Sequence, residues 1–478
     1  MTDPERRERR AGRLRRSAVR LAVGAGAALL VFGLYALLTG GGARDPRARG
    51  SLEDVLALRE RSDFNVLFVL VDTLRADHLG SYGYERDTSP NLDALAASGI
   101  RFAGQISQSS WTKCSMASLW TGLYPVRTRV LRAYDMLSPQ ARMPAEIFQE
   151  AGFRTAGIWR NGWIAPNFGF SQGFEIYLSP KPRRDSRLRR VQAPNITAQG
   201  SDADILVSAL EFLRAHGHER WFLYLHLMDV HQYAYSEETA LFGTNYLDSY
   251  DNAIRWVDSL LGHLFAALDE RGLRERTLIV FSSDHGEAFG EHDGEGHARN
   301  VYGEVTTTPL ILSFPFRLEP GIVVRERSEN VDLWPTVLEL VGLPALPDTD
   351  GASLVPQIAA AAKDTGGGDE DGIAFAQIDQ TWGRNGMQPR PMVAFNDGHW
   401  RLIYRAADPK RSELFDIAQD RKERNDVAAE NPEVVEALAA RASAYLESPP
   451  PPWGDDAPTV EVDEMLMNQL RALGYGVQ

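Results

Sequence analysis

Two adjacent residues in SSDHGEAFGEHDGEGH, residues 282–297, are of types that bind divalent metal ions. Asp284 offers a carboxylate oxygen and His285 an imidazole nitrogen, a mixed pair that suits Zn²⁺ or Mn²⁺ better than the all-oxygen site that Ca²⁺ prefers. The four glycines of the segment allow the loop to fold back, which would bring His292 or His297 towards this pair. The alternative interpretation is a solvated acidic loop with incidental histidines.

Three aspartates each close an apolar run: Asp72, Asp229 and Asp284. Because ligands of open α/β sheets gather at the carboxyl ends of strands, we expect these positions to share one site. His231 follows Asp229 by two residues, and His285 follows Asp284 directly. An aspartate after a strand can also serve only as the cap of the next helix, and this alternative stays open for each one taken alone.

The elements that must position these residues alternate along the chain. Buried strands are predicted from apolar runs at 65–72, 153–159, 220–229, 277–284 and 309–315. Segments with helical periodicity that end at glycine lie between them, at 91–99, 143–152 and 249–272. This alternation predicts an α/β fold with a large, mostly parallel sheet that helices cover on both faces.

The composition is that of a globular chain of enzyme size, with 478 residues, 44% of them apolar and 24% charged. The formal net charge is −14, although eight of the first 20 residues are arginine, so the rest of the chain is more acidic still. Such an acidic body argues against nucleic acid as a partner. Cys114 is the only cysteine, so no intramolecular disulfide can form.

An uncharged run near the N-terminus, LAVGAGAALLVFGLYALL at 21–38, would form a helix roughly 27 Å long, close to the thickness of a bilayer core. We expect a transmembrane anchor at 17–39, preceded by a basic cytoplasmic tail at 1–16. This orientation predicts a single-pass protein of the bacterial inner membrane with a periplasmic catalytic domain. A cleaved signal peptide is the alternative, but no A-x-A cleavage site follows the run.

Several segments resemble the signature blocks of sulfatases, which belong to the alkaline phosphatase superfamily. In chain order they are VDTLRADHLGSYGYERDTSPNLDALAASGIRF (71–102), WTKCSMASLWTGLYP (111–125), LHLMDVHQYAY (225–235), the segment 282–297 and VDLWPTVLELVGLP (331–344). The resemblance extends from about Asn65 to the C-terminus. It implies an alkaline phosphatase/sulfatase-like fold with a smaller C-terminal antiparallel-sheet subdomain, and an ester hydrolase.

The second block places a threonine at the position of the sulfatase nucleophile. Sulfatases convert the first cysteine of C-x-P-S-R-x-x-x-x-T-G to formylglycine, and counting back from Thr121-Gly122 puts Thr112 at this position. Cys114 then stands where the motif has proline, and Met116 stands where it has arginine. Cys114 is therefore predicted to be a packed, inert side chain.

Other members of the superfamily use a metal-bound threonine at this position, among them lipoteichoic acid synthases, phosphoethanolamine transferases and nucleotide pyrophosphatases/phosphodiesterases. The resemblance therefore implies that Thr112 is the nucleophile. It also implies one divalent ion with four ligands: Asp72, Thr112, Asp284 and His285. Sulfatases usually have two aspartates where this chain has Asp72-Thr73, which favours manganese or zinc over calcium.

The remaining site residues also come from the resemblance. His231 matches the sulfatase D-x-H histidine near the leaving group, and His297 falls where sulfatases carry a lysine that contacts the transferred group, so both are predicted to be catalytic. The candidate substrate contacts are Lys113, Arg160 and Asn161. For the first two, an exposed basic residue is the alternative.

A second metal ion would need ligands from the same region. The nearest equivalents to the ligands of two-metal relatives are Asp229, His231 and His297. Their D-x-H spacing is shorter than the Asp-x-x-x-His of those relatives, so a second metal is the minority interpretation.

The resemblance also orders the rest of the chain. The expected parts are a linker (40–62), the catalytic domain (63–362), a flexible linker (363–372), the C-terminal subdomain (373–446), and a Pro-rich spacer with a terminal helix (447–478). Within the C-terminal subdomain, PMVAFNDGHWRLIYR predicts a hairpin that turns at 396–398.

Three functions stay open on the sequence. The first is a hydrolase or transferase that cleaves a phosphodiester or phosphoester through a covalent intermediate on Thr112. The second is a sulfatase that lacks the formylglycine motif, and the third is a metal-stabilised, non-catalytic binding protein. The substrate is expected to be a phospho- or sulfo-ester, either lipid-linked or polyanionic. The basic segment 180–192 either contacts such a polyanion or is a solvated loop, and the oligomeric state is open.

Overall fold

The computed structural model describes residues 45–182, 188–190, 200–363, 372–382, 387–451, 453–454 and 458–461. The chain divides into two units, residues 1–47 and 48–478, and every element named below belongs to the second. The predicted tail (1–16) and anchor (17–39) lie outside the described residues, as does the predicted terminal helix beyond residue 461. Within the described ranges, no helix has both the length and the apolar character needed to cross a bilayer.

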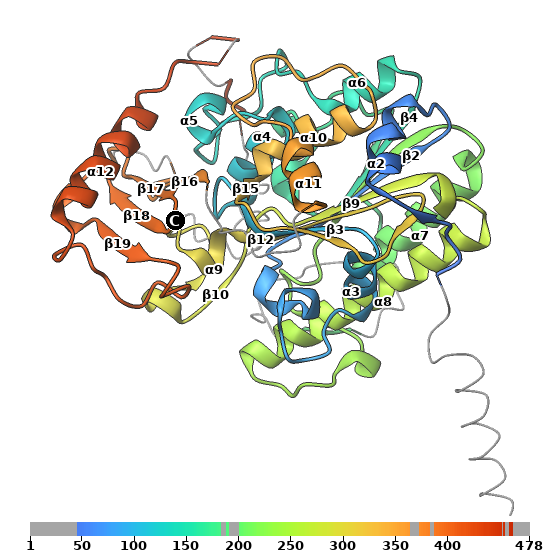
Figure 1. The fold of residues 1–478 in the computed structure, drawn as a ribbon, viewed down its shortest axis with the longest axis horizontal. Coiled ribbons are helices and arrows are strands. Elements are labelled where there is room, and N and C mark those ends of the chain that lie inside the picture. Colours follow the sequence, from blue (N-terminus) through green and yellow to red (C-terminus); the bar gives the residue numbers. More distant parts are fainter. Residues whose placement is uncertain are drawn as a thin grey trace, which may run out of the picture. The chain divides into compact units, whose positions relative to one another are not determined.

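A nine-stranded sheet forms the centre of the larger unit (Figure 1). In spatial order its strands are β14 (Ile322–Val324), β3 (Ile100–Ile106), β12 (Thr307–Ser313), β9 (Thr277–Ser282), β2 (Asn65–Val71), β7 (Trp221–Leu227), β4 (Arg154–Trp159) and β5 (Ile176–Leu178), and β15 (Ser328–Glu329) also pairs with β3. All pairings are parallel except those of β12, which runs antiparallel to β3 and β9. The prediction of a large, mostly parallel sheet is confirmed.

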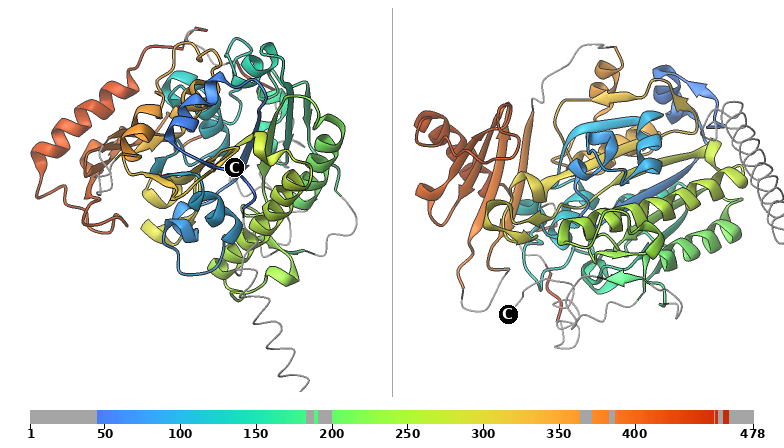
Figure 2. Two further views of the ribbon diagram at one scale, coloured as in Figure 1. Left: turned by 45° about the vertical axis from the view of Figure 1, so that its right-hand side comes forward. Right: turned by 90° about the horizontal axis from the view of Figure 1, so that it is seen from below.

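Helices cover both faces of this sheet (Figures 1 and 2). One core contains side chains from α2 (Leu52–Ala57), α4 (Thr112–Thr121), α6 (Pro144–Glu150), α10 (Leu333–Leu340) and α11 (Val355–Ala361). The other contains side chains from α3 (Pro90–Ala97), α7 (Asp202–His216) and α8 (Tyr246–Glu270). The strands between these layers are buried on both sides, which explains why they appear in the sequence as continuous apolar runs.

The central strand β2 shows how the two cores are separated. Its residues alternate between them, with Phe68 and Leu70 in the core that contains α4 and Val69 and Val71 in the other. Side chains two residues apart along a strand point to the same face. Asp72 follows Leu70 by two residues, so the strand directs its side chain towards α4.

The C-terminal part forms a second, antiparallel sheet. Its strands are β16 (Ile373–Asp379), β17 (Pro391–Asp397), β18 (Trp400–Arg405) and β19 (Glu413–Asp416), and α12 (Pro432–Leu446) packs against β17 and β18. A separate apolar cluster joins this helix and sheet. The predicted hairpin is β17–β18, and it turns at Gly398, whose φ of 56° suits glycine.

Three short strand pairs complete the unit. They are β1 (Arg49–Gly50) with β13 (Arg317–Leu318), β6 (Arg189–Arg190) with β8 (Ala234–Tyr235), and β10 (Ala288–Phe289) with β11 (Glu295–Gly296). Two short helices, α5 (Pro125–Thr128) and α9 (Gly303–Thr306), lie in connecting segments. The β10–β11 pair folds the glycine-rich loop back on itself, as the sequence predicts.

The segment after residue 47 differs from the predicted linker at 40–62. Ser51 and Asp54 form a capping box at the start of α2, and Val55 and Leu58 are fully buried in the core that contains α4. A capped helix with buried apolar residues belongs to the folded unit, because its amphipathic pattern is satisfied by packing on that core.

Candidate active site

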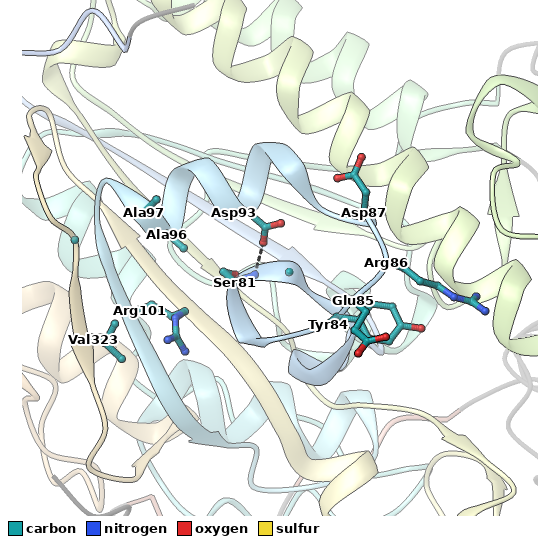
Figure 3. A pocket seen from close by; sticks show the side chains of 12 residues that line it. Ser81, Tyr84, Glu85, Arg86, Asp87, Asp93, Ala96, Ala97, Arg101 and Val323 are labelled. Atoms are coloured by element: carbon teal, nitrogen blue, oxygen red, sulfur yellow. Dashed lines mark hydrogen bonds between the residues drawn. The ribbon is translucent and has the colours of Figure 1, made fainter. Parts of the chain in front are cut away.

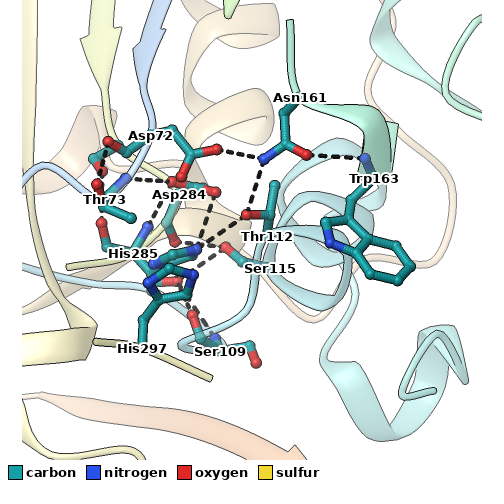
Figure 4. Close-up of polar contacts among 12 residues, drawn as sticks. Asp72, Thr73, Ser109, Thr112, Ser115, Asn161, Trp163, Asp284, His285 and His297 are labelled. Carbon is teal, nitrogen blue, oxygen red and sulfur yellow. Dashed lines mark hydrogen bonds and ion pairs between the residues drawn. The ribbon is translucent and has the colours of Figure 1, made fainter. Parts of the chain in front are cut away.

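Thr112, the candidate nucleophile, is the first residue of α4 (Figure 4). Trp111 before it is extended, with φ −134° and ψ 125°, and Gly122 after the helix has a left-handed φ of 69°. All ten helix residues are buried, so packing holds the first turn in place. The Oγ1 atom of Thr112 lies 3.1 Å from Nε2 of His285, and Asn161 Nδ2 donates to it at 3.3 Å.

The two carboxylates come from neighbouring parallel strands. Asp72 follows β2, and Asp284 comes two residues after β9, so both lie at the same edge of the sheet. Thr73, held at a left-handed φ of 59°, donates its N–H to Asp284 Oδ1 at 3.2 Å. Ser115, one turn along α4, donates to the backbone carbonyl of Asp284 at 2.7 Å and ties the helix to this loop.

Two carboxylate oxygens at this edge have no hydrogen-bond partner, Asp72 Oδ1 and Asp284 Oδ2. Both side chains are fully buried, and buried charges in proteins are normally paired or bind a metal ion. Ligand atoms of Asp72, Asp284 and His285 lie within 4.8 Å of one another. These two carboxylates and the imidazole, together with the hydroxyl of Thr112, form a donor set that fits a divalent cation.

The surroundings shift the pKa values of the two carboxylates in opposite directions. Burial opposes the ionisation of Asp72, but the imidazoles of His231, His226 and His285 outweigh it and lower the pKa of Asp72. Burial raises the pKa of Asp284, and the negative charge of Asp72 adds to this shift. A bound divalent cation would stabilise both anions at once.

Two further histidines, His231 and His297, lie next to this group. The ring of His297 lies 4.7 Å from that of His285 and 5.0 Å from that of His231, measured between centroids. Glu287 Oε1 lies 3.0 Å from His297 Nδ1. Burial lowers the pKa of His231 to about 4. Burial alone would also lower the pKa of His297, but the carboxylate of Glu287 outweighs it and raises this pKa.

The comparison with known families decides the broader identity. A model of the family described as Sulfatase matches residues 64–343, more than half of the chain. The chain belongs to the sulfatase family. A second model, described as N-sulphoglucosamine sulphohydrolase, C-terminal, matches residues 290–446. This sulfatase-family protein is an ester hydrolase.

Individual relatives are distant. Arylsulfatase K of Xenopus laevis is 23% identical over 429 residues, covering 75% of this chain and 78% of the relative. N-acetylgalactosamine-6-sulfatase of Rattus norvegicus is 28% identical over 343 residues, covering 61% of this chain and 65% of the relative. Thus the chain spans slightly less than two thirds of the second relative.

Solved structures show the same fold. A phosphonate monoester hydrolase of Agrobacterium radiobacter has a TM-score of 0.63 at 19% identity, covering 80% of this chain and 95% of that one. A 2-O GAG sulfatase has a TM-score of 0.65 at 17% identity, covering 81% and 92%. At these identities the likeness concerns the fold alone.

Lys113 of this sulfatase-family protein does not reach the site, contrary to the sequence prediction. Its Nζ donates to the carbonyls of Ala133 and Asp135, at 2.7 Å each, and its nearest aromatic ring is Phe168, with the centroid at 4.3 Å. Successive helical residues are rotated by about 100°, so Lys113 leaves the helix in a different direction from Thr112. Burial lowers the pKa of Lys113 to about 7.

The loop that holds Lys113 also contacts the end of the described chain. The N–H of Met136 donates to the carbonyl of Pro458, and the N–H of Val460 donates to the carbonyl of Tyr134, at 2.9 Å each. The segment at 458–460 therefore fastens the loop whose carbonyls anchor the first turn of α4.

Arg160 is also diverted from the predicted substrate contact. It donates to Asp229 Oδ1 at 2.6 Å and to Asp202 Oδ1 at 2.9 Å. The other oxygen of Asp229 accepts from the N–H of Asp202 at 2.8 Å and from Trp256 Nε1 at 2.9 Å. Because both oxygens of Asp229 are engaged, the minority alternative of a second metal ion at Asp229, His231 and His297 is not supported.

Cys114 is buried, as predicted, with 1% of its surface exposed. It packs in the core that contains α4, and burial raises the pKa of its thiol to about 12. A buried, protonated thiol is a poor nucleophile. Of the two side chains, it is Thr112 that faces the carboxylate cluster.

Sequence reasoning missed Glu287 and His226. His226 Nε2 lies 3.0 Å from Asp72 Oδ2, and Asn161 Nδ2 donates to the same oxygen at 2.6 Å. A usable signal was present, because His226 is the one imidazole inside the otherwise apolar run WFLYLHL of β7. A lone polar residue within a buried strand needs a partner, and here the partner is Asp72.

A surface cavity of about 580 Å³ lies away from this chemistry, beside α3 (Figure 3). Its lining includes Arg86, which forms ion pairs with Asp248 and Asp251 at 2.8 Å, and Asp93, which accepts from the N–H of Ser81 at 2.6 Å. None of the residues predicted for the active site lines this cavity.

Proposed function

We propose that this protein cleaves a phosphoester that carries a single negative charge, such as a phosphodiester, with Thr112 as the nucleophile. One observation carries the proposal: the side-chain oxygen of Thr112 contacts His285 and Asn161, which in turn contact the carboxylates of Asp284 at 3.3 Å and Asp72 at 2.6 Å. A serine or threonine hydroxyl is a weak nucleophile until a base or a metal activates it. The residues that surround Thr112 are suited to that task.

The site would hold its metal ion through Asp72, Thr112, Asp284 and His285. When bound, a divalent cation supplies a Lewis acid that lowers the pKa of a coordinated hydroxyl and polarises the ester. The position of Thr112 at the N-terminus of α4 also favours an anionic group, because the positive end of the helix dipole lies there.

The chain's own residues then divide the proton transfers. Thr112 loses its hydroxyl proton to solvent, and its Oγ1 forms a bond to phosphorus while the bond from phosphorus to the leaving oxygen breaks. His297, oriented by Glu287, gives a proton to the leaving alcohol. Water, or an acceptor alcohol, then forms the new bond to phosphorus as the bond from phosphorus to Thr112 Oγ1 breaks. His231 takes the proton of the attacking hydroxyl, Thr112 Oγ1 recovers a proton from solvent, and proton exchange with solvent resets both histidines.

A sulfate ester is the second candidate substrate. It is supported by the names of the relatives, arylsulfatase K and N-acetylgalactosamine-6-sulfatase, while the phosphonate monoester hydrolase supports the phosphorus chemistry. Both substrate classes present a tetrahedral group with one negative charge.

The proposal also places the catalytic unit outside the cytoplasm, behind a membrane anchor at 17–39. Protease protection of the tagged N-terminus in spheroplasts would test this location.

The first experiment compares the purified full chain with Thr112→Ala, Thr112→Ser and Cys114→Ala. Each is stripped of metal, reloaded with Mn²⁺, Zn²⁺ or Ca²⁺, and assayed with bis(p-nitrophenyl) phosphate and p-nitrophenyl sulfate. We expect diester cleavage with Mn²⁺ or Zn²⁺, a loss of more than about a hundredfold in Thr112→Ala, partial activity in Thr112→Ser, and full activity in Cys114→Ala. Alanine cannot be converted to formylglycine, so sulfate turnover that disappears in Cys114→Ala would refute the assignment of Thr112.

A further inference from the structure

β7 places a tyrosine and a histidine on the face of the sheet that carries the candidate active site. Tyr224 and His226 are two residues apart, so their side chains point the same way. In the parallel register of β2 and β7, His226 lies opposite Leu70, and Asp72 follows Leu70 by two residues. The N–H of Asp72 also donates to the carbonyl of Leu227 at 3.0 Å. The register therefore brings His226 beside Asp72.

The three side chains form a directed chain of hydrogen bonds. The Tyr224 hydroxyl lies 2.6 Å from His226 Nδ1, and His226 Nε2 lies 3.0 Å from Asp72 Oδ2. Because a carboxylate only accepts, the proton sits on Nε2, which donates to Asp72. Nδ1 is then the acceptor for the Tyr224 hydroxyl. Burial raises the pKa of Tyr224 well above its usual value, so this hydroxyl keeps its proton.

This chain of bonds gives the two oxygens of Asp72 different roles. Oδ2 accepts from both His226 Nε2 and Asn161 Nδ2, whereas Oδ1 has no hydrogen-bond partner. All of these side chains are buried, with at most 1% of their surface exposed. A carboxylate pinned at one oxygen cannot rotate freely, so the other oxygen keeps a fixed direction.

We infer that Tyr224 and His226 are positioning residues that hold Asp72 with Oδ1 turned towards the cation site. The inference rests on the metal site of the proposed function and extends it to residues that contact neither substrate nor metal. Outer partners of this kind typically change metal affinity by about 10- to 100-fold when they are removed.

Packing links the same tyrosine to the nucleophile helix. The ring of Tyr224 stacks on Phe68 of β2, with centroids 5.4 Å apart, and meets Trp120 of α4 edge-on at 5.0 Å. Tyr224 thus contacts both the strand that leads to Asp72 and the helix that begins with Thr112. This double contact fixes the hydroxyl that orients His226.

The test measures the affinity of the metal-free full chain for Mn²⁺ by titration calorimetry. His226→Leu removes the donor to Asp72, and we expect its Kd to rise by about 10- to 100-fold. His226→Gln keeps an N–H near the place of Nε2 and should retain most of the affinity, while Tyr224→Phe should lose affinity several-fold. Tyr445→Phe is the matched control, since its hydroxyl bonds to Gln377 at 3.0 Å in the C-terminal part.

Several outcomes decide the inference. A Kd for His226→Leu within about twofold of the parent overturns it, and so does a His226→Gln variant that binds as weakly as His226→Leu. Circular dichroism of the metal-free variants checks folding. If His226→Leu does not fold, a Kd for Tyr224→Phe equal to that of Tyr445→Phe overturns the inference, and a weaker one supports it.

The outcome for the proposed function is separate. If the parent binds Mn²⁺ but cleaves no phosphoester, the proposed substrate fails while the order of affinities still decides the role of His226. If the parent binds neither Mn²⁺ nor Zn²⁺, the cation site fails and the inference fails with it.

Discussion

Two clusters in the described chain bring one histidine and two acidic side chains within metal-binding distance of one another. The first is the candidate active centre, with Asp72, Asp284 and His285, and the second joins the glycine-rich loop to the C-terminal part, with His292, Glu304 and Glu423. Composition and spacing are alike in the two. The two clusters differ in the hydrogen bonds and ion pairs that their ligand atoms form with residues outside the cluster.

In the second cluster each of the three side chains already has a hydrogen-bond or ion-pair partner. His292 Nδ1 lies 2.9 Å from Glu304 Oε1, and Nε2 lies 2.7 Å from the carbonyl of Glu423. The carboxylate of Glu423 pairs with Arg401 at 2.8 Å and accepts from the N–H of Gly303 at 3.0 Å. In the candidate active centre, neither Asp72 Oδ1 nor Asp284 Oδ2 has a hydrogen-bond partner, and the ion-pair contact of Asp284 Oδ2 is with His285 Nε2 of the same cluster, at 3.3 Å. Proximity alone therefore does not mark a metal site; buried carboxylate oxygens with no hydrogen-bond partner and no partner outside the cluster do.

The largest expected difference comes from removing one carboxylate in each cluster. Asp284→Asn should lose its metal and more than about a hundredfold of its activity, because it removes a direct ligand. Removing even an outer partner of a ligand typically costs about 10- to 100-fold in metal affinity or activity. Glu304→Gln should keep the metal content of the parent. Metal per chain after dialysis, measured by mass spectrometry, checks both variants. Equal metal loss in the two would abolish the distinction between the clusters.

Metal removal should destabilise the active centre and leave the second cluster unaffected. At a free Mn²⁺ concentration 100 times Kd, binding stabilises the folded state by about 2.7 kcal/mol. Scanning calorimetry with and without a chelator should therefore show a higher unfolding temperature for the metal-loaded parent. The same shift is expected for Glu304→Gln. A chelator effect that vanishes in this variant would place the stabilising ion at the second cluster.

The smallest effect concerns pH and belongs to the second cluster. Burial would lower the pKa of His292, but the bonds to Glu304 and to the carbonyl of Glu423 outweigh it and raise the pKa to about 9. A raised pKa means that protonated His292 stabilises the folded state. This stabilisation is complete below about pH 6.5 and is lost as pH rises through about 9. After solvent screening it is worth about 1–2 kcal/mol. Urea unfolding at pH 6.5 and 9.5 should show this loss for the parent and not for His292→Gln.

Strand ends were the reliable part of the sequence prediction. Asp72, Asp284 and His285 follow buried apolar runs, and parallel pairing brings such ends together whatever the loops do. The five predicted strands are all present, although the antiparallel direction of β12 leaves no trace in an apolar run. Direction depends on the connection, which hydrophobic pattern does not encode.

Side-chain direction was the unreliable part. Lys113 and Arg160 stand beside site residues in the sequence, yet each points to partners that are distant in the chain. For Arg160 the partners Asp202 and Asp229 lie 42 and 69 residues away. Tertiary packing determines which face of α4 points towards the site and which residues pair with Arg160. The position of a residue in a motif therefore could not reveal the direction of its side chain.

The contact between 458–460 and the loop around Lys113 has a consequence for biosynthesis. The carbonyls that anchor Lys113 belong to a loop that donates a hydrogen bond to the carbonyl of Pro458 and accepts one from the N–H of Val460, so the final setting of α4 involves residues made long after Thr112. Domains fold largely from the N-terminus as the chain emerges. A nascent chain would therefore carry Thr112 long before its helix is secured, and we expect that helix to reach its final setting only after residues 458–460 have been made.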